Sequence, residues 1–204
     1  TTKYSGFSFT LIHGNLAFQE ASMNQTTLQK LQQDCLTILG EITIPWKVPA
    51  DTIFEAIALQ GWNLRHAPLP WGQLCACDAW RQEILISNDF EQNLTCPSLH
   101  REVLHWLLAA QLGHIRMHTL AILQGKGGSA LESAATQYAM AYLLPLETLQ
   151  AHPDVRYLSH GEPTKNERWR RLSRLAEHFL VPTACVQATL ERYGLIAREK
   201  VEAA

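Results

Sequence analysis

The sequence predicts an α+β fold, in which amphipathic helices pack around a small antiparallel or mixed sheet. Apolar residues recur at helical spacing in the middle and at the end of the chain, most clearly between Ser98 and His118. Short β-prone runs occupy residues 62–87 instead. With 204 residues, 47% hydrophobic and 18% charged, the chain is long enough to bury a substantial core.

The first helices are expected on either side of a proline-containing break. Apolar positions follow helical spacing over residues 24–39, with Asn24 or Thr26 as the cap. A shorter helix is predicted at 51–60, where Asp51 caps it and Gly61 ends it. The predicted buried face of this short helix consists of Ile53, Phe54, Ile57 and Ala58.

Strands are expected next. WNLRHAPLP, residues 62–70, is extended and limited by its prolines. LCACDAWRQEILIS, residues 74–87, has two β-prone runs on either side of Asp78 and Ala79, which is typical of a hairpin.

Helices are predicted for most of the remaining chain. Ser98 is the expected cap of the long helix, and Pro145 is expected to end the helix that follows it. The predicted segments are helices at 98–118, 131–144, 166–179 and 183–193, with a polar loop at 152–164. We therefore divide the chain into an N-terminal extension with one helix (1–47), a central domain (48–150) and a C-terminal helical module (151–204).

Several classes of protein are disfavoured by composition. No run of about 18 apolar residues is present, and the N-terminal stretch lacks the apolar core and cleavage site of a signal peptide. The five cysteines are scattered without a CxxC pair, which argues against a zinc ribbon and suggests free thiols in a reducing compartment. We therefore expect a cytoplasmic protein that does not interact with membranes.

The stretch LLAAQLGHIRMH, residues 107–118, has the spacing of the zinc-protease motif H-E-x-x-H. In that motif two His four residues apart bind one metal from the same helix face, and the Glu acts as general base on the metal-bound water. The first two positions here are Ala110 and Gln111, and only the final His114 is present.

The order of motifs around this helix resembles the ImmA/IrrE-type metallopeptidase family. A helix ending at Gly61, an extended PLP (68–70) and a hairpin closing on ILISN (84–88) precede it. AATQYAMAYLLP, residues 134–145, is similar to the family's E-A-N-x-F-A-x-x-L-L-M-P helix, and the resemblance covers roughly residues 50–196. It implies a zincin-like metallopeptidase fold followed by a helix-turn-helix-like module. Active members of the family cleave helix-turn-helix repressors in response to stress or mobile-element induction.

The sequence departs from the family pattern at the positions of the metal ligands and the general base. The resemblance places the first ligand His at Ala110, the general base at Gln111, the second ligand at His114 and the third ligand at Ala134. A catalytic zinc needs three protein ligands to lower the pKa of its bound water to about 7. Because only His114 is retained, we expect no metal, no other cofactor and no catalysis.

Two alternatives to this loss remain open. His118 follows His114 by four residues and is the candidate substitute ligand in a rebuilt metal site. Glu132 lies two residues before Ala134, which on a helix rotates its side chain by about 200°, so we expect it to point away from the site. The same substitutions could also be engineered into an active protease. The alternative function is therefore a zinc-dependent endopeptidase of transcriptional repressors, inactivated by substitution or using displaced ligands.

The C-terminal module has a basic surface of its own. Residues 1–164 contain nine basic and 14 acidic residues (−5), whereas residues 165–204 contain eight and five (+3). Two helices with a short turn are compatible with a helix-turn-helix, so DNA, an acidic partner and a purely structural pair are all open. The candidate binding residues are Lys165, Arg168, Arg170, Arg171 and Arg174.

The principal functional hypothesis is a catalytically inactive metallopeptidase-like protein, or pseudoprotease, that binds a protein partner. A helix-turn-helix transcription regulator is the candidate partner, because the acidic body suits a basic DNA-binding protein. An exposed hairpin strand could pair with an extended segment of the partner without any metal. The residues proposed for this pairing are Glu83, Ile84, Leu85, Ile86 and Ser87.

Overall fold

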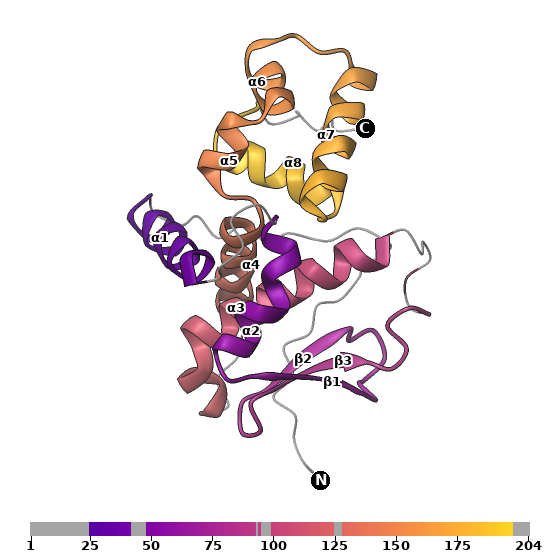
Figure 1. Ribbon diagram of the computed structural model, residues 1–204. Helices are drawn as coiled ribbons and strands as arrows, with labels where there is room; N and C mark the ends of the chain where they lie inside the picture. The colour runs from indigo at the N-terminus through magenta and orange to yellow at the C-terminus, as the bar shows by residue number, and fades with distance from the viewer. Residues whose placement is uncertain (1–24, 42–47, 93, 95–98, 125–127, 198–204) are drawn as a thin grey trace.

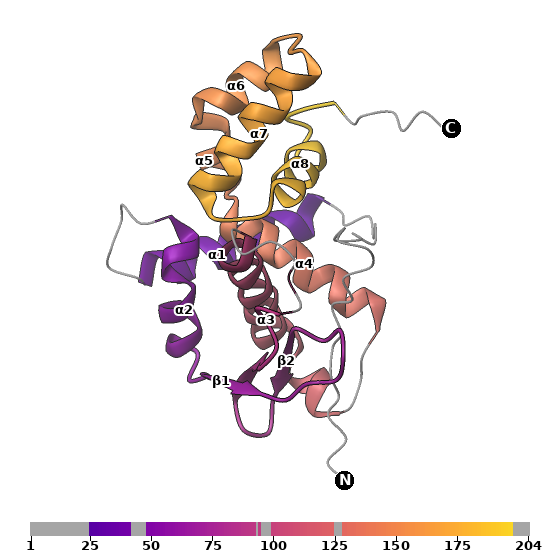
Figure 2. The ribbon, with the colours of Figure 1, turned by 90° about the vertical axis from the view of Figure 1, so that its right-hand side faces the viewer.

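The computed structural model describes residues 25–41, 48–92, 94, 99–124 and 128–197, and it confirms the α+β class. The helices are α1 (Gln25–Glu41), the 3-10 turn η1 (Pro49–Thr52), α2 (Ile53–Leu59), α3 (His100–Leu123), α4 (Ser129–Leu143), α5 (Leu146–Ala151), α6 (Pro153–His160), α7 (Lys165–Phe179) and α8 (Thr183–Arg192). The strands are β1 (Asn63–Ala67), β2 (Cys75–Asp78) and β3 (Glu83–Ser87). In Figure 1 the sheet lies at the bottom, α3 and α4 cross the middle, and α5–α8 gather at the top. The turned view in Figure 2 agrees.

The sheet is mixed, with the strand order β1-β3-β2. β2 and β3 form the predicted antiparallel hairpin, with Cys77 opposite Ile84, and β1 pairs with β3 in parallel. β3 is therefore the central strand, and its backbone is hydrogen-bonded on both sides. The prediction that Glu83–Ser87 is an exposed strand available for pairing is wrong. Among the described residues, the outer edges of the sheet belong to β1 and β2.

The helices α3 and α4 pack closely because a glycine lies at their contact. A Cβ atom built on Gly113 would lie 2.8 Å from Tyr138 Cβ and 3.2 Å from the Cα of Ala135. Both distances are tighter than normal packing allows, so only glycine permits this approach. The close contact holds the α4 side chains near the middle of α3.

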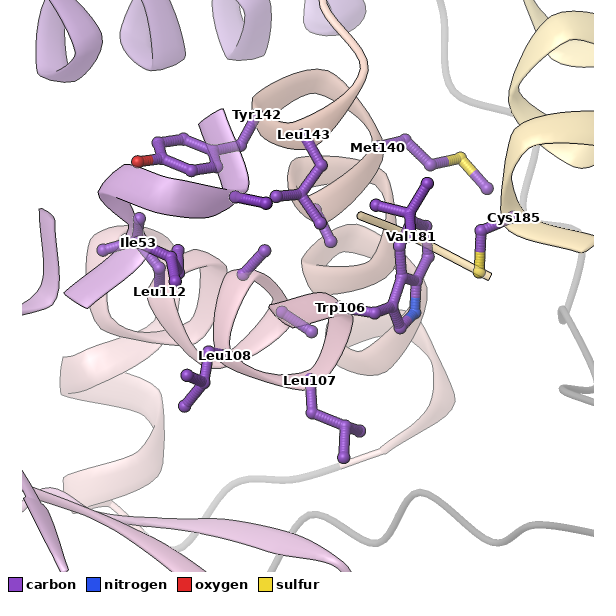
Figure 3. Packing of buried hydrophobic residues seen from close by; sticks show 14 of the residues in the cluster. Ile53, Trp106, Leu107, Leu108, Leu112, Met140, Tyr142, Leu143, Val181 and Cys185 are labelled. Atoms are coloured by element: carbon purple, nitrogen blue, oxygen red, sulfur yellow. The ribbon is translucent and has the colours of Figure 1, made fainter. Parts of the chain in front are cut away.

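The main hydrophobic cluster includes residues from Leu31 of α1 to Ile196 after α8. Figure 3 shows Trp106 of α3 and Met140 of α4 lying together with Val181, in the turn between α7 and α8, and with Cys185 of α8. Trp106 is fully buried, and burying so large a side chain is among the largest single hydrophobic contributions in a core. The C-terminal helices therefore share the core of α3 and α4.

Several sequence predictions of helix ends and faces differ from the structure. Thr26 and Asp51 lie inside α1 and η1 rather than at caps, while Asn24 and Ser98 lie outside the described residues. Asp51 instead accepts a hydrogen bond from Arg101, 3.0 Å away. The short helix buries Ile53, Ala56 and Ile57, whereas the predicted core residues Phe54 and Ala58 are exposed.

The predicted loop at 152–164 is mostly helical. α6 occupies Pro153–His160, with proline in its first turn and the His152 side chain accepting a hydrogen bond from the Asp154 amide. Proline is compatible with this position because its missing amide hydrogen would be unpaired there in any case.

The turn between α7 and α8 contains a left-handed residue. Leu180 has φ +55° and ψ +47°, a conformation that costs a non-glycine residue about 1 kcal/mol. Its side chain packs against the core, which offsets part of that cost. None of the described helices is long and apolar enough to span a membrane.

Candidate functional site

The positions of the protease-like motif lie in the middle of α3, at the centre of the molecule. Ala110, Gln111 and His114 are each 0% exposed. Their burial follows from the sheet on one side and from α4, drawn close at Gly113, on the other. A polar residue in such an environment needs a hydrogen-bonding partner, so the contacts of Gln111 and His114 define what this site can do.

His114 and His118 form a buried pair on α3. Their Nδ1 atoms are 3.1 Å apart, and their ring centroids are 5.3 Å apart. One ring must donate and the other accept, which requires at least one neutral imidazole. Burial, followed by the charge of His114, lowers the pKa of His118 to about 4. His118, the candidate substitute ligand, therefore already contacts His114 through its Nδ1 atom.

Glu132 of α4 lies beside this pair, contrary to the prediction from helical rotation. Its Oε1 is 3.6 Å from His114 Nε2. The prediction failed because it measured the rotation from Ala134, while Ala135 and Tyr138 are the α4 residues that contact Gly113. Glu132 is one turn N-terminal to that contact, and a long side chain there reaches back to α3. An acidic side chain therefore lies beside His114, although Ala134, where the resemblance places the third ligand, has none.

Gln111 makes contact with β2 across the site. The thiol of Cys77 donates a hydrogen bond to Gln111 Oε1 over 2.9 Å, and the Gln111 Nε2 atom has no hydrogen-bond partner among the described residues. Burial, together with the negative charges of Cys75, Glu132 and Asp78, raises the pKa of the Cys77 thiol well above its usual value. Cys77 is therefore held as an unreactive thiol.

This donor set does not fit a catalytic metal. His114 and Glu132 could each supply one ligand, but Ala110 supplies none. Across the part of the chain that the structure describes, no group of three His, Cys, Asp or Glu side chains is arranged to hold a metal ion. Gln111 cannot accept a proton near neutral pH, so it cannot act as general base. Among the described residues, this arrangement therefore offers hydrogen-bonding groups and charge, but not three metal ligands together with a general base.

The predicted basic residues of α7 are largely paired within the module. Arg171 and Arg174 both donate to Asp154 of α6, at 2.5 and 2.6 Å, and Arg171 also lies over the Tyr157 ring. Arg168 donates to the Ala197 carbonyl, 3.1 Å away, and lies 3.5 Å from Glu191. Lys165 and Arg170 are exposed. The structure therefore brings three of the five candidate residues into internal contacts.

Sequence reasoning missed three residues that shape these sites. Cys77 and Glu132 gave no usable signal, because their roles depend on contacts between β2, α3 and α4. Asp154 falls in the predicted loop, yet it is 9% exposed beneath two arginines. The P-D pair at 153–154 is a helix-start signal that could have located it.

The comparisons with known proteins support the fold alone. No protein family and no curated protein matches the chain. A Mycobacterium tuberculosis transcriptional regulator is similar in structure, with a TM-score of 0.52 and 15% sequence identity. The similarity covers 80% of this chain and 46% of the regulator, so the chain spans less than half of that protein.

Proposed function

We propose that the chain is a catalytically inactive, ImmA/IrrE-like pseudoprotease with a zincin-like core, which binds a protein partner in transcriptional regulation. The observation that carries the proposal is the buried pair Ala110–Gln111 at the motif of α3. One ligand and the general base are missing at the same place, while His114 and Glu132 remain on either side. A site that has lost its chemistry and kept its framework is suited to binding.

The resemblance and the structural comparison support a regulatory role from different directions. Active members of the ImmA/IrrE family, which the sequence resembles, act on helix-turn-helix repressors. The structural neighbour is itself a transcriptional regulator, although its low identity speaks only to fold. We propose a helix-turn-helix regulator as the partner, because an acidic body with a charge of −5 over residues 1–164 is complementary to a basic DNA-binding protein.

The outer edge of β2 is the best surface for an extended segment of the partner. β3 lies on one side of β2, and the other side is unpaired among the described residues. Cys77 of β2 also contacts Gln111, so a segment added to this edge would run beside the motif. Strand addition supplies affinity through backbone hydrogen bonds and needs no metal.

The proposal is tested with a purified helix-turn-helix protein encoded next to the gene of this chain. The wild-type chain should bind this protein and leave it intact in the presence of zinc. The double variant Ala110→His/Gln111→Glu restores a ligand and a base, and should bind zinc and cleave the same protein. Zinc-dependent cleavage by the wild-type chain would establish the endopeptidase alternative, and absence of binding would refute the partner role.

A further inference from the structure

The helix α7 has its basic residues on two sides that differ in their contacts. Arg168, Arg171 and Arg174 face α6 and α8, where each contacts a carboxylate. Lys165 and Arg170 are exposed, and neither forms a hydrogen bond or an ion pair with a described residue. Two basic side chains of α7 therefore remain available to another molecule.

A tryptophan lies on the helix surface between these two basic residues. Trp169 is 61% exposed, which makes it the most exposed large apolar side chain of α5–α8. At about 100° per residue, Lys165, Trp169 and Arg170 fall within an arc of roughly 140° around the helix. Asn166 and Ser173 lie in the same arc, and no acidic residue falls in it between Lys165 and Ser173. We call the surface formed by Lys165, Asn166, Trp169, Arg170 and Ser173 the tryptophan face.

Two tryptophans elsewhere are more exposed but have no such neighbours. Trp71 is 96% exposed, and no lysine or arginine lies within four residues of it in the sequence. Trp80 is 82% exposed, and the adjacent Arg81 is paired with Asp78. Of these three exposed tryptophans, only Trp169 has neighbouring basic residues that lack a carboxylate partner among the described residues.

An unpaired nucleobase between two phosphates matches this arrangement. An exposed indole ring can stack on any base, and basic side chains beside it attract the phosphates. The bases of a duplex are stacked on one another, so a single strand offers them to an aromatic ring without the cost of unstacking.

Two other kinds of ligand match the surface less well. The helix α8, which would have to read a duplex, has Gln187 hydrogen-bonded to Glu191 instead of available to a base. A membrane-binding helix needs a broad apolar face, but the apolar face of α7 is buried in the core. Trp169 is the one large apolar side chain of α7 that is exposed.

We propose that the tryptophan face binds single-stranded nucleic acid. Trp169 stacks on an unpaired base, and Lys165 and Arg170 contact the phosphates on either side of that base. Stacking and phosphate contacts do not distinguish one base from another, so the binding has little sequence preference. The site belongs to α7, whereas the proposed protein partner pairs with β2, so the inference does not depend on the proposed function.

The test measures the binding of fluorescein-labelled oligothymidylate and oligouridylate, each about 20 nucleotides long, to the full chain by fluorescence anisotropy. At low salt we expect a Kd on the order of 10–100 μM for at least one of them, and weaker binding to a duplex of the same length. The slope of log K against log salt should be about −1.4, because each of two phosphate contacts in a single strand contributes about −0.7. The tighter ligand of the two identifies DNA or RNA as the preferred class.

Matched variants locate the binding surface. Trp169→Ala should weaken binding by at least about fivefold, whereas Trp169→Phe keeps an aromatic ring and should lose less. Trp71→Ala removes a more exposed tryptophan from the loop before β2 and should bind as the wild type does. Lys165→Gln should make the salt slope shallower by about 0.7, whereas Lys30→Gln, at an exposed position of α1, should leave it unchanged.

Three results would each overturn the proposal. They are no binding of either oligonucleotide at low salt, equal or tighter binding of the duplex, and unchanged affinity in Trp169→Ala. Vesicles of anionic phospholipid provide a further comparison, since Trp169-dependent binding to vesicles without binding to either oligonucleotide would assign the tryptophan face to a membrane instead. The binding of a regulator protein is measured separately, so failure of this proposal would leave the partner role untouched.

Discussion

At the scale of single residues, the histidine pair of α3 couples the site to pH. His118 is buried, and both its burial and the neighbouring His114 disfavour the charged ring. Its folded-state pKa of about 4 lies below the usual value of 6.5. The unfolded chain therefore binds more protons between these two values, and stability falls as pH falls through that window.

The first prediction concerns His118→Gln. Between pH 7 and pH 4 the wild type should lose on the order of 1–3 kcal/mol of unfolding free energy through His118 alone. Because other groups titrate as well, the measured quantity is the difference in pH slope between wild type and variant, from urea denaturation. The slope should be shallower in His118→Gln and unchanged in the exposed control His66→Gln. Equal slopes in all three proteins would show that His118 is not held neutral.

Asp154 is the second residue whose environment makes a prediction. Burial alone would raise its pKa, but hydrogen bonds from Arg174 and Arg171 hold the pKa below its ordinary value. The carboxylate therefore stays charged and neutralises much of the basic face of α7. Because of this pairing, α7 has fewer positive charges available to a polyanion than its basic sequence suggests.

The second prediction follows from this pairing. Asp154→Asn should lower the unfolding free energy by about 1–3 kcal/mol, because two arginines lose their partner. It should also strengthen nonspecific DNA binding and steepen the dependence of log K on log salt by about two, since two cations are freed for phosphates. Fluorescence anisotropy over a salt series measures this. Unchanged affinity and slope in a folded variant would contradict the assignment.

At the scale of elements, the contact between α3 and α4 positions the candidate site. Gly113 lets α4 approach closely enough for Glu132 to reach His114. The third prediction is that Gly113→Ala lowers the unfolding free energy by about 1–3 kcal/mol through overpacking against Tyr138. Gly40→Ala is the matched control, because nothing lies within 4 Å of its added Cβ in α1. If both substitutions had the same small effect, the close approach would not be a constraint.

Elements that follow from local pattern were predictable, and those that depend on tertiary contacts were not. The hairpin and the helices α3, α4, α7 and α8 were confirmed, because periodicity and turn residues specify them locally. The central position of β3 was missed, because the sequences of β1 and β3 do not reveal that the two strands pair in parallel. Helix α6 was missed because its polar composition and Pro153 were read as a loop, although Pro153–Asp154 is a helix-start signal.

The candidate site was likewise predictable only where it depends on local sequence. The complete burial of Ala110, Gln111 and His114 depends on packing against α4 and the sheet, and only their placement on one helix followed from the sequence. The position of Glu132 did not, because it depends on how far α4 is shifted along α3 by the contact at Gly113. One acidic side chain, Glu132, lies beside His114, whereas Ala110 and Gln111 offer neither an imidazole nor a carboxylate.

In the molecule as a whole, the middle of α3 and the C-terminal helices share one hydrophobic cluster. Trp106 lies one turn before Ala110 and packs with Val181 and Cys185 in that cluster. A partner bound beside Gln111 and His114 would contact the same helix that supports α7 and α8. Binding at one end and the stability of the other are therefore expected to be linked through α3.

The zinc content of the purified chain, after exposure to zinc and removal of the excess, tests most directly whether the motif of α3 holds a metal. Elemental analysis should find well below one zinc per chain in the wild type. Ala110→His/Gln111→Glu should retain about one, because the introduced imidazole would join His114 and Glu132 to supply three ligands. The control Ala110→Leu/Gln111→Glu adds similar bulk without a ligand and should retain little. About one tightly bound zinc in the wild-type chain would show that the site still holds a metal and that the protein is not the proposed pseudoprotease.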